Sequence, residues 1–345
     1  MTGQYFKDRD LKNMKVVDEM LTSLPPLCTE YFNDVSIARA PSTMANYARQ
    51  LARFFGWLES NDFRDKKPVT AYDAADLAAV TSDDVTLFLH ELRHSGDGDA
   101  TLRAYCRSLS SFYTHLNHKG KLSENPVNGV IRPRTKRSPK IYMEADDVKR
   151  FRSTVDTAAG LSERMSKYRD TTGAAARDKV IVSVLYDTGI RVSELVGLDL
   201  TNIDLTRCRM SVLRKGGAVD NVYFSDETHD EIVEYLDFRK KIKKDDKAFL
   251  LVTVGKYKGQ RMTVRSVENI IKKYALAAGV TNSEKISPHK MRHTRAMGLL
   301  KATGNIALVQ KQLGHKNITS TTVYAEADDS DLSAIRNVGD YAENE

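Results

Sequence analysis

The segment TGIRVSEL at residues 188–195 places Arg191 at the start of a helix, directly after a glycine turn at Gly189. Glu194 follows one helical turn later, so an ordinary surface ion pair between these two side chains is a sufficient explanation of the segment taken alone. The segment indicates a particular function only in combination with three other segments further along the chain.

The second segment is SPHKMRH at residues 287–293. Ser287 as N-cap and Pro288 at the first helical position predict that a helix begins here. His289 and Arg292 are three residues apart, so they emerge on one face of that helix and can reach one phosphate together. An ordinary polar helix start is the alternative for this segment alone.

The third segment is LGH at residues 313–315, and the fourth contains Tyr324, nine residues beyond His315. Gly314 is predicted to end a helix whose apolar face includes Leu308, Val309 and Leu313. A capping histidine and a packed tyrosine are the alternatives for these two residues when each is considered separately.

A β-hairpin is predicted between the first and second segments. Residues 207–214 alternate apolar and polar side chains, Gly216-Gly217 supplies a turn, and residues 219–224 can return as the partner strand. Lys215 lies at the tip of this hairpin.

The four segments, in this order and with 23 residues from Arg292 to His315, form a joint pattern that resembles the tyrosine recombinase family, which includes phage integrases and Xer-type recombinases. The resemblance covers about residues 28–330. It implies that Tyr324 is the nucleophile and that Glu194 orients the site. The remaining implied catalytic residues are Arg191, Lys215, His289, Arg292 and His315. Asn221 stands where many family members have an arginine, so Arg214 stays open as an alternative to Lys215.

These residue types suit the cleavage of a phosphodiester. Guanidinium groups donate paired hydrogen bonds to the nonbridging oxygens, where negative charge builds up. A phenol with a pKa near 10 needs a base, for which His289 is the candidate, while Lys215 can protonate the departing 5′ oxygen. A phosphotyrosyl ester retains the energy of the broken linkage, so neither a cofactor nor a metal is expected.

The expected fold class is mainly α with a small β-sheet (α+β). By the resemblance, a helical SAM-like core-binding domain and a mixed catalytic domain of the DNA breaking-rejoining enzyme fold form a C-shaped clamp. Helices are predicted over 42–60, from near 81, over about 102–116, and then over 145–157, 174–187, 192–198 and 263–278. Residues 249–254 are predicted to be a strand and 158–173 a polar loop. The predicted parts are an N-terminal extension (1–27), the helical domain (28–125), a basic linker (126–141), the catalytic domain (142–324) and a C-terminal tail (325–345).

The composition, with 41% hydrophobic and 29% charged residues among 345, predicts a cytoplasmic protein without a signal or membrane segment. The resemblance implies that this protein is DNA-associated. The whole chain carries +7 and the acidic tail −6, so residues 1–324 carry +13. This charge is compatible with a polyanionic partner. Three scattered cysteines suggest neither a disulfide framework nor a metal cage.

The expected partner is duplex DNA with specific recombination sites. The predicted DNA-binding residues are Arg103, Arg107, Arg132, Arg134, Lys136, Arg137 and Lys140. A solvated hinge is the alternative interpretation of the basic linker. The resemblance also implies a homotetramer on DNA formed from free monomers, with the tail as a protomer-exchange helix and with accessory DNA-bending proteins as optional partners.

Two other functions stay open at this point. A type IB topoisomerase would use a similar active site as a monomer and would relax DNA without exchanging partners. A non-catalytic DNA-binding protein would need only the basic surfaces and would bind DNA in a salt-sensitive way without a covalent product.

Overall fold

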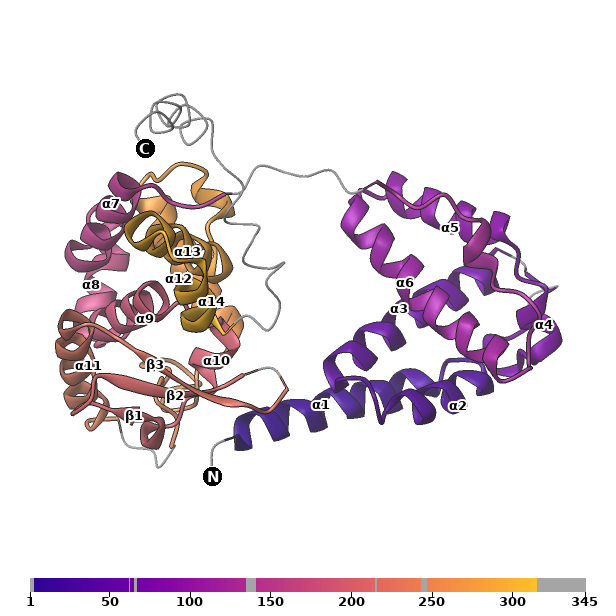
Figure 1. Ribbon diagram of the computed structural model, residues 1–345, viewed down its shortest axis with the longest axis horizontal. Helices are drawn as coiled ribbons and strands as arrows, with labels where there is room; N and C mark the ends of the chain where they lie inside the picture. The colour runs from indigo at the N-terminus through magenta and orange to yellow at the C-terminus, as the bar shows by residue number, and fades with distance from the viewer. Residues whose placement is uncertain are drawn as a thin grey trace, which may run out of the picture. The chain divides into compact units, whose positions relative to one another are not determined.

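The computed structural model describes residues 3–61, 63–64, 67–134, 141–214, 216–242 and 247–314. The chain divides into two compact units, Gln4–Ser138 and Pro139–Glu345, the second of which also takes in the first three residues (Figure 1). No helix in the described ranges has both the length and the hydropathy needed to cross a bilayer.

The first unit is helical throughout its described part. Its elements are α1 (Gln4–Leu21), α2 (Pro26–Val35), α3 (Pro41–Ser60), the 3-10 turn η1 (Val69–Ala71), α4 (Ala74–Ala78), α5 (Ser82–His94), α6 (Asp99–His118) and the 3-10 turn η2 (Pro126–Gly129). The predicted capping box at the start of α5 is present, with the Thr81 amide donating to Asp84 Oδ2 at 2.8 Å. This all-helical architecture confirms the fold class expected for this part of the chain.

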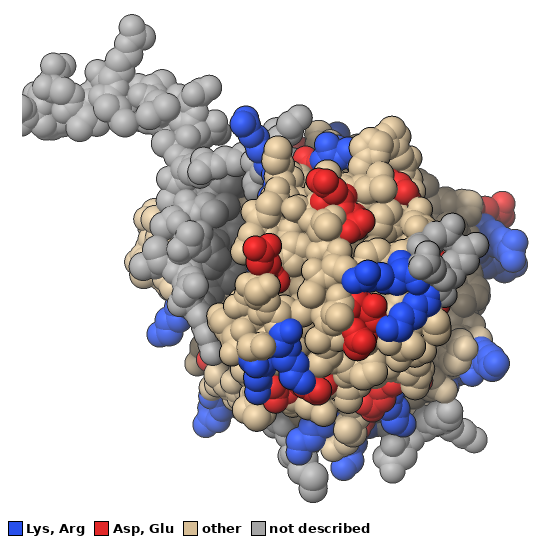
Figure 2. All heavy atoms as spheres, turned by 90° about the vertical axis from the view of Figure 1, so that its right-hand side faces the viewer, with Lys and Arg blue, Asp and Glu red and all other residues tan. Residues whose placement is uncertain are grey.

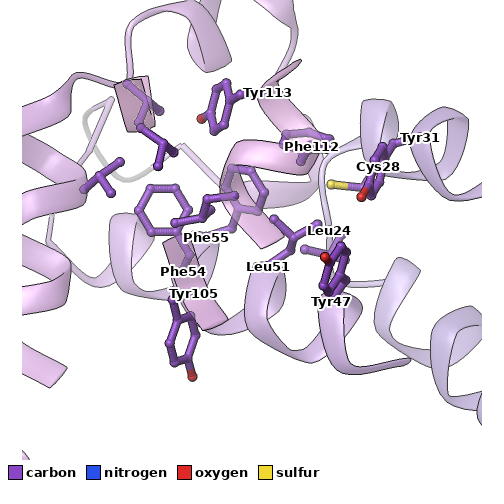
Figure 3. Packing of buried hydrophobic residues seen from close by; sticks show 14 of the residues in the cluster. Leu24, Cys28, Tyr31, Tyr47, Leu51, Phe54, Phe55, Tyr105, Phe112 and Tyr113 are labelled. Atoms are coloured by element: carbon purple, nitrogen blue, oxygen red, sulfur yellow. The ribbon is translucent and has the colours of Figure 1, made fainter. Parts of the chain in front are cut away.

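The core of this unit forms where the apolar faces of α2, α3 and α6 meet (Figure 3). Phe55 from α3 and Phe112 from α6 lie edge to face with ring centroids 5.9 Å apart, and Tyr31 from α2 packs on the other side of Phe112 at 5.4 Å. The three rings are less than 1% exposed, and they follow from the spacing of three and four between apolar residues along each helix.

Both ends of the helical unit extend beyond the predicted range of 28–125. Helix α1, within the predicted N-terminal extension, lies against α3 and buries Val17. At the other end, Val127 and Val130 belong to the same hydrophobic core, although the predicted linker begins at residue 126. Residues Met14, Val16, Met20 and Leu21 of α1 also pack against this core but stay partly exposed. After α6, only Val127 and Val130 among the described residues of the predicted linker reach the core, which is too few for a periodic signal.

The second unit mixes helices with a small sheet. Its helices are α7 (Ala145–Thr157), α8 (Glu163–Thr171), α9 (Ala174–Thr188), α10 (Val192–Val196), α11 (Asp226–Arg239), α12 (Val264–Ala277), α13 (Pro288–Thr303) and α14 (Ile306–Leu313), with 3-10 turns η3 (Leu200–Asn202) and η4 (Ser283–Lys285). The strands are β1 (Ile203–Asp204), β2 (Arg209–Leu213) and β3 (Val219–Tyr223), antiparallel in the order β1-β2-β3. The predicted hairpin is β2–β3, and Leu213↔Val219 is its last pair before the turn.

Helix α9 is central in this unit and is buried on all sides, because α7, α8, α10, α11, α12 and α13 all pack against it. It ends at Gly189, whose φ of +63° turns the chain toward α10. The start of α10 is therefore held directly against the core, and β2 lies next to α10 (Figure 1).

Two predictions for this unit were wrong. The supposed polar loop at 158–173 contains α8, whose Arg169 is buried and donates to the carbonyl oxygens of Val155 and Asp156 at the end of α7. The supposed strand at 249–254 forms only the isolated bridge Leu251↔Arg261. Its apolar residues are instead buried as an irregular segment, which a short apolar run cannot reveal.

Candidate active site

Arg191 is the N-cap residue of α10. Its amide donates to Glu194 Oε2 at 2.8 Å and its Nη1 to Glu194 Oε1 at 2.9 Å. The Glu194 side chain is only 3% exposed, whereas that of Arg191 is 40% exposed. The buried carboxylate of Glu194 therefore orients Arg191 and leaves much of the Arg191 guanidinium accessible to a ligand.

Arg292 emerges from α13, which begins as predicted with Ser287 as N-cap and Pro288 at the first helical position. Its side chain is buried, with the residue 3% exposed. Nη1 donates to the Gly189 carbonyl oxygen at 2.6 Å and Nη2 to the Leu313 carbonyl oxygen at 2.5 Å. One guanidinium thus joins the turn before Arg191 to the end of α14.

His289 lies one turn before Arg292 and is exposed. Desolvation by the surrounding protein, followed by the positive charges of Lys290, Arg292 and Arg191, lowers the pKa of His289. His289 and Arg292 are three residues apart on α13, and Arg292 is hydrogen-bonded to the turn before Arg191. The lowered pKa favours the neutral imidazole, which is the form that can act as a base.

Arg214, the alternative to Lys215, is engaged inside the protein. It is 5% exposed, and its guanidinium donates to Glu194 Oε2 at 2.9 Å and to Asp220 Oδ2 at 3.1 Å. A third hydrogen bond, 3.2 Å long, runs from Nη2 to the Gln312 carbonyl oxygen. Two carboxylates therefore neutralise the charge of Arg214, whereas Gly189 and Leu313 bind Arg292 through uncharged carbonyl oxygens. Lys215 remains the preferred prediction for the hairpin lysine.

Three predicted site residues, Lys215, His315 and Tyr324, lie outside the described residues. Their neighbours in the chain are described. Arg214 and Gly216 flank Lys215, and Gly314, with a φ of +64°, ends α14 immediately before His315. Of the predicted apolar face of α14, Val309 and Leu313 are buried but Leu308 is 45% exposed.

A basic groove of about 570 Å³ lies on the helical unit. The predicted DNA-binding residues Arg103, Arg107 and Arg132 line it, and Arg103 Nη1 also donates to the Arg134 carbonyl oxygen at 2.9 Å. The other predicted residues, Lys136, Arg137 and Lys140, lie outside the described residues. The sequence-based prediction missed Arg39, His115 and His118, which line the same groove from α6 and from the turn after α2.

One face of the helical unit has mixed charge. Figure 2 shows basic and acidic side chains next to one another there. Many of the cations of this unit are paired, as in the bridges Arg93–Asp99 at 2.5 Å and Arg53–Asp97 at 3.5 Å. The groove is notable in this unit because Arg39, Arg103, Arg107 and Arg132 all line it.

Metal ligation has no candidate in the described ranges, which contain no cluster of three or more His, Cys, Asp or Glu side chains that could hold an ion. The reactive groups brought together by the described residues are cationic or imidazole side chains on α10, α13 and the loops around them. Such a set fits an anionic oxygen ligand better than a divalent cation.

Two family models match the chain. The phage integrase family matches residues 142–331, and the phage integrase N-terminal SAM-like domain matches residues 28–120. Among curated proteins, tyrosine recombinase XerC of Escherichia coli O157:H7 is 28% identical over 317 residues, covering 91% of this chain and 96% of that protein. XerC of Shigella dysenteriae serotype 1 (strain Sd197) has the same identity and coverage.

Solved structures show the same fold. The Tn1549 transposon integrase in complex with circular intermediate DNA has a TM-score of 0.65 at 20% identity, covering 90% of this chain and 99% of that one. The XerH site-specific recombinase bound to its difH substrate has a TM-score of 0.63 at 17% identity, with coverages of 93% and 94%. The expected fold class and family resemblance are thereby confirmed.

Proposed function

The chain belongs to the phage integrase family, and from this membership we propose that it is a site-specific DNA recombinase which cleaves and rejoins duplex DNA through a covalent 3′-phosphotyrosine at Tyr324. The observation that carries the proposal is the convergence of Arg191, His289 and Arg292. Arg292 is hydrogen-bonded to the turn before Arg191, and His289 lies one helical turn before Arg292 on α13. A phosphate is the ligand that this set of groups suits best.

The proposed reaction is an in-line transesterification. The Tyr324 oxygen forms a bond to phosphorus while the bond from phosphorus to the 5′ oxygen breaks. His289 accepts the phenol proton, and Lys215 donates a proton to the leaving 5′ oxygen. Arg191, Arg292 and His315 stabilise the charge on the nonbridging oxygens. Attack by a different 5′ hydroxyl reverses these steps and joins the strands in a new combination.

Glu194 is proposed to keep Arg191 in place for this reaction. Its buried carboxylate holds both the amide and the guanidinium of Arg191. A fixed guanidinium loses less rotamer entropy when it binds phosphate, so orientation before binding favours the transition state.

Duplex DNA carrying recombination sites is the proposed partner, bound by both units with most contacts to phosphates. In the helical unit, the groove lined by Arg39, Arg103, Arg107 and Arg132 is the proposed contact. We further propose a homotetramer on DNA assembled from free monomers, protomer exchange through the tail, accessory DNA-bending proteins and a cytoplasmic, DNA-associated location. The Tn1549 integrase structure named above contains circular intermediate DNA, and the XerH structure contains its difH substrate.

The two alternative functions are less well supported. The relatives are named tyrosine recombinases, which disfavours a type IB topoisomerase. The same names disfavour a DNA-binding protein without catalysis.

The test uses nicked suicide duplexes drawn from the DNA that flanks the gene. We expect a denaturation-resistant adduct whose attachment site maps to Tyr324 by mass spectrometry. Tyr324→Phe should form none, and Arg191→Ala should slow adduct formation by at least about 100-fold. Tyr257→Phe is the matched control, because Tyr257 is a 58% exposed tyrosine of the same unit.

Each alternative predicts a different result. Salt-sensitive binding without any adduct from the unsubstituted protein would support the non-catalytic protein. Relaxation of supercoiled DNA of any sequence, without exchanged products, would support the topoisomerase. An adduct through another residue would refute the assignment of Tyr324.

A further inference from the structure

Arg214 closes the turn of the β2–β3 hairpin through its main chain. Its amide donates to the Ala218 carbonyl oxygen at 2.8 Å, and its own carbonyl oxygen accepts from the Gly217 amide at 3.1 Å. Lys215 is the next residue of the chain. The conformation of Arg214 therefore fixes where the segment that carries Lys215 begins.

The side chain of Arg214 fixes this turn to two other elements. As described above, its guanidinium is buried and donates to Glu194 on α10, to Asp220 on β3 and to the Gln312 carbonyl oxygen on α14. Glu194 is the same carboxylate that holds Arg191. One side chain thus connects the hairpin with the first arginine and with the helix that precedes His315.

The approach of α14 to Arg214 is close. Gly314 has a φ of +64°, and a Cβ built on it would meet Arg214 Nε at 2.7 Å and Cζ at 2.8 Å. Arg214 also lies in a groove of about 670 Å³ whose walls include Asp220 and Tyr223 of β3 and Ala307 and Lys311 of α14. Its hydrogen bonds reach both walls, so the position of the hairpin is coupled to that of the end of α14.

We propose that Arg214 is a positioning residue for the cleavage step, which fixes the strands on either side of Lys215 relative to Arg191 and to the end of α14. This inference rests on the proposed function, in which Lys215 protonates the 5′ oxygen. Arg214 itself makes no contact with the DNA in this role. Its three charged or carbonyl partners require a planar guanidinium, because a lysine ammonium at the same place cannot span all of them.

The leaving group provides a readout that a purely structural role would not change. In ordinary DNA the departing 5′ oxygen must take up a proton as its bond to phosphorus breaks. In a 5′-bridging phosphorothiolate the departing atom is sulfur, which leaves as a thiolate without a proton, because thiols are far more acidic than alcohols. A defect in the placement of Lys215 should therefore be largely removed by the sulfur substrate.

The experiment measures single-turnover cleavage of matched oxygen and sulfur suicide duplexes by the full chain. We expect Arg214→Lys to slow cleavage of the oxygen substrate about 100-fold, within the range of general-acid effects. We expect a slowing of less than about 3-fold on the sulfur substrate, since that substrate needs no acid. DNA affinity should be unchanged. Arg207→Lys is the control, because Arg207 is a 69% exposed arginine next to the same sheet.

Two other outcomes would overturn the proposal. Equal slowing on both substrates would mean that Arg214 does not act through the leaving group. Unchanged rates on both would mean that it positions nothing. If neither substrate gives an adduct with the unsubstituted protein, the proposed function itself has failed, so the two failures are distinguishable.

A milder variant covers the case in which Arg214→Lys does not fold, as judged by circular dichroism. Asp220→Asn keeps a hydrogen-bond acceptor but removes one charge from the network, at a side chain that is 46% exposed. We expect a smaller loss on the oxygen substrate and again little loss on the sulfur substrate. A loss of equal size on both would overturn the inference.

Discussion

The guanidinium of Arg292 donates to the carbonyl oxygen of Gly189 at 2.6 Å, which joins residues 103 positions apart in the chain. The same guanidinium reaches the Leu313 carbonyl oxygen, two residues before His315. Arg292 therefore assembles the loops of the site in addition to any contact with phosphate. Arg191 differs, since its side chain is 40% exposed and pairs only locally with Glu194.

This difference predicts separate effects of the two arginines on stability. Arg292→Lys should lower the free energy of unfolding by about 2 to 3 kcal/mol, because buried carbonyl oxygens lose charged donors. Arg191→Lys should change it by less than about 0.5 kcal/mol, as is usual for an exposed side chain. Denaturant unfolding measures both values, and both variants should lose adduct formation. Equal stability of the two variants would contradict the assembling role of Arg292.

The lowered pKa of His289 predicts the direction of a pH dependence. If neutral His289 accepts the phenol proton, cleavage should rise with pH through a pKa below the usual 6.5 and then level off. The measurement is a single-turnover pH profile from about pH 5 to pH 8. His289→Gln should be slower by about 100-fold and should lose this rise. A rate that falls as pH rises through the same window would show that the protonated imidazole is required instead.

Substituting Gly314 and Gly304 in turn separates two effects of an added Cβ: backbone strain, which both positions share, and a clash with Arg214, which only Gly314 has. Both follow a helix with positive φ, at +64° and +60°, but a Cβ on Gly304 would meet nothing within 4 Å. Each substitution to alanine should cost about 1 to 2 kcal/mol of stability through the left-handed backbone. Only Gly314→Ala should also displace Arg214 and reduce cleavage. Equal cleavage rates of the two variants would show that the close approach of Gly314 to Arg214 does not affect cleavage.

The sequence predicted the parts of the site whose residues carry local signals. The N-cap Ser287 with Pro288, the glycine turn at Gly189 and the alternating hairpin strands each depend on a few neighbouring residues. Such local rules are sufficient to place Arg191 and Arg292 on their elements. The family pattern then indicated that these elements meet.

The features that the sequence did not predict depend on contacts between distant segments. Arg214 was considered only as a rival to Lys215, because its partners Glu194 and Gln312 are 20 and 98 residues away. Arg169 similarly makes α8 part of the packed unit, although the polar composition of 158–173 indicated a loop. Tertiary contacts of one buried arginine are not encoded in local composition.

The groove of the helical unit predicts a change in the salt dependence of DNA binding. Arg107 is exposed and lines this groove. If it neutralises one phosphate, Arg107→Gln should weaken binding and reduce the slope of log affinity against log salt by about 1. Arg93→Gln is the control, because Arg93 of the same unit is already paired with Asp99. An unchanged slope for Arg107→Gln would remove this residue from the DNA contact.

The environment of Glu231 on α11 predicts that a substitution at this position stabilises the fold, whether or not the protein is a recombinase. Its Oε2 is buried without a hydrogen-bond partner among the described residues. Desolvation raises the pKa of Glu231, and the negative charges of Asp156 and Glu227 raise it further, against the hydrogen bond from Ser183 and the charge of Arg152. The folded protein therefore holds a proton on Glu231 more tightly than the unfolded chain does.

The sign of the pH dependence follows from this shift. Protonation of Glu231 favours folding below the unfolded pKa of 4.5, and this contribution is lost as pH rises through the higher folded pKa. At neutral pH the native protein retains a partly buried charge, so Glu231→Gln should raise Tm there. The gain should shrink as pH falls toward 4.5, where the carboxyl becomes neutral.

Glu234→Gln, at an exposed position of the same helix, should show no such pH-dependent gain. Thermal unfolding of both variants at several pH values tests this, and a gain for Glu231→Gln that is the same at all pH values would mean that relief of the charge is not its cause.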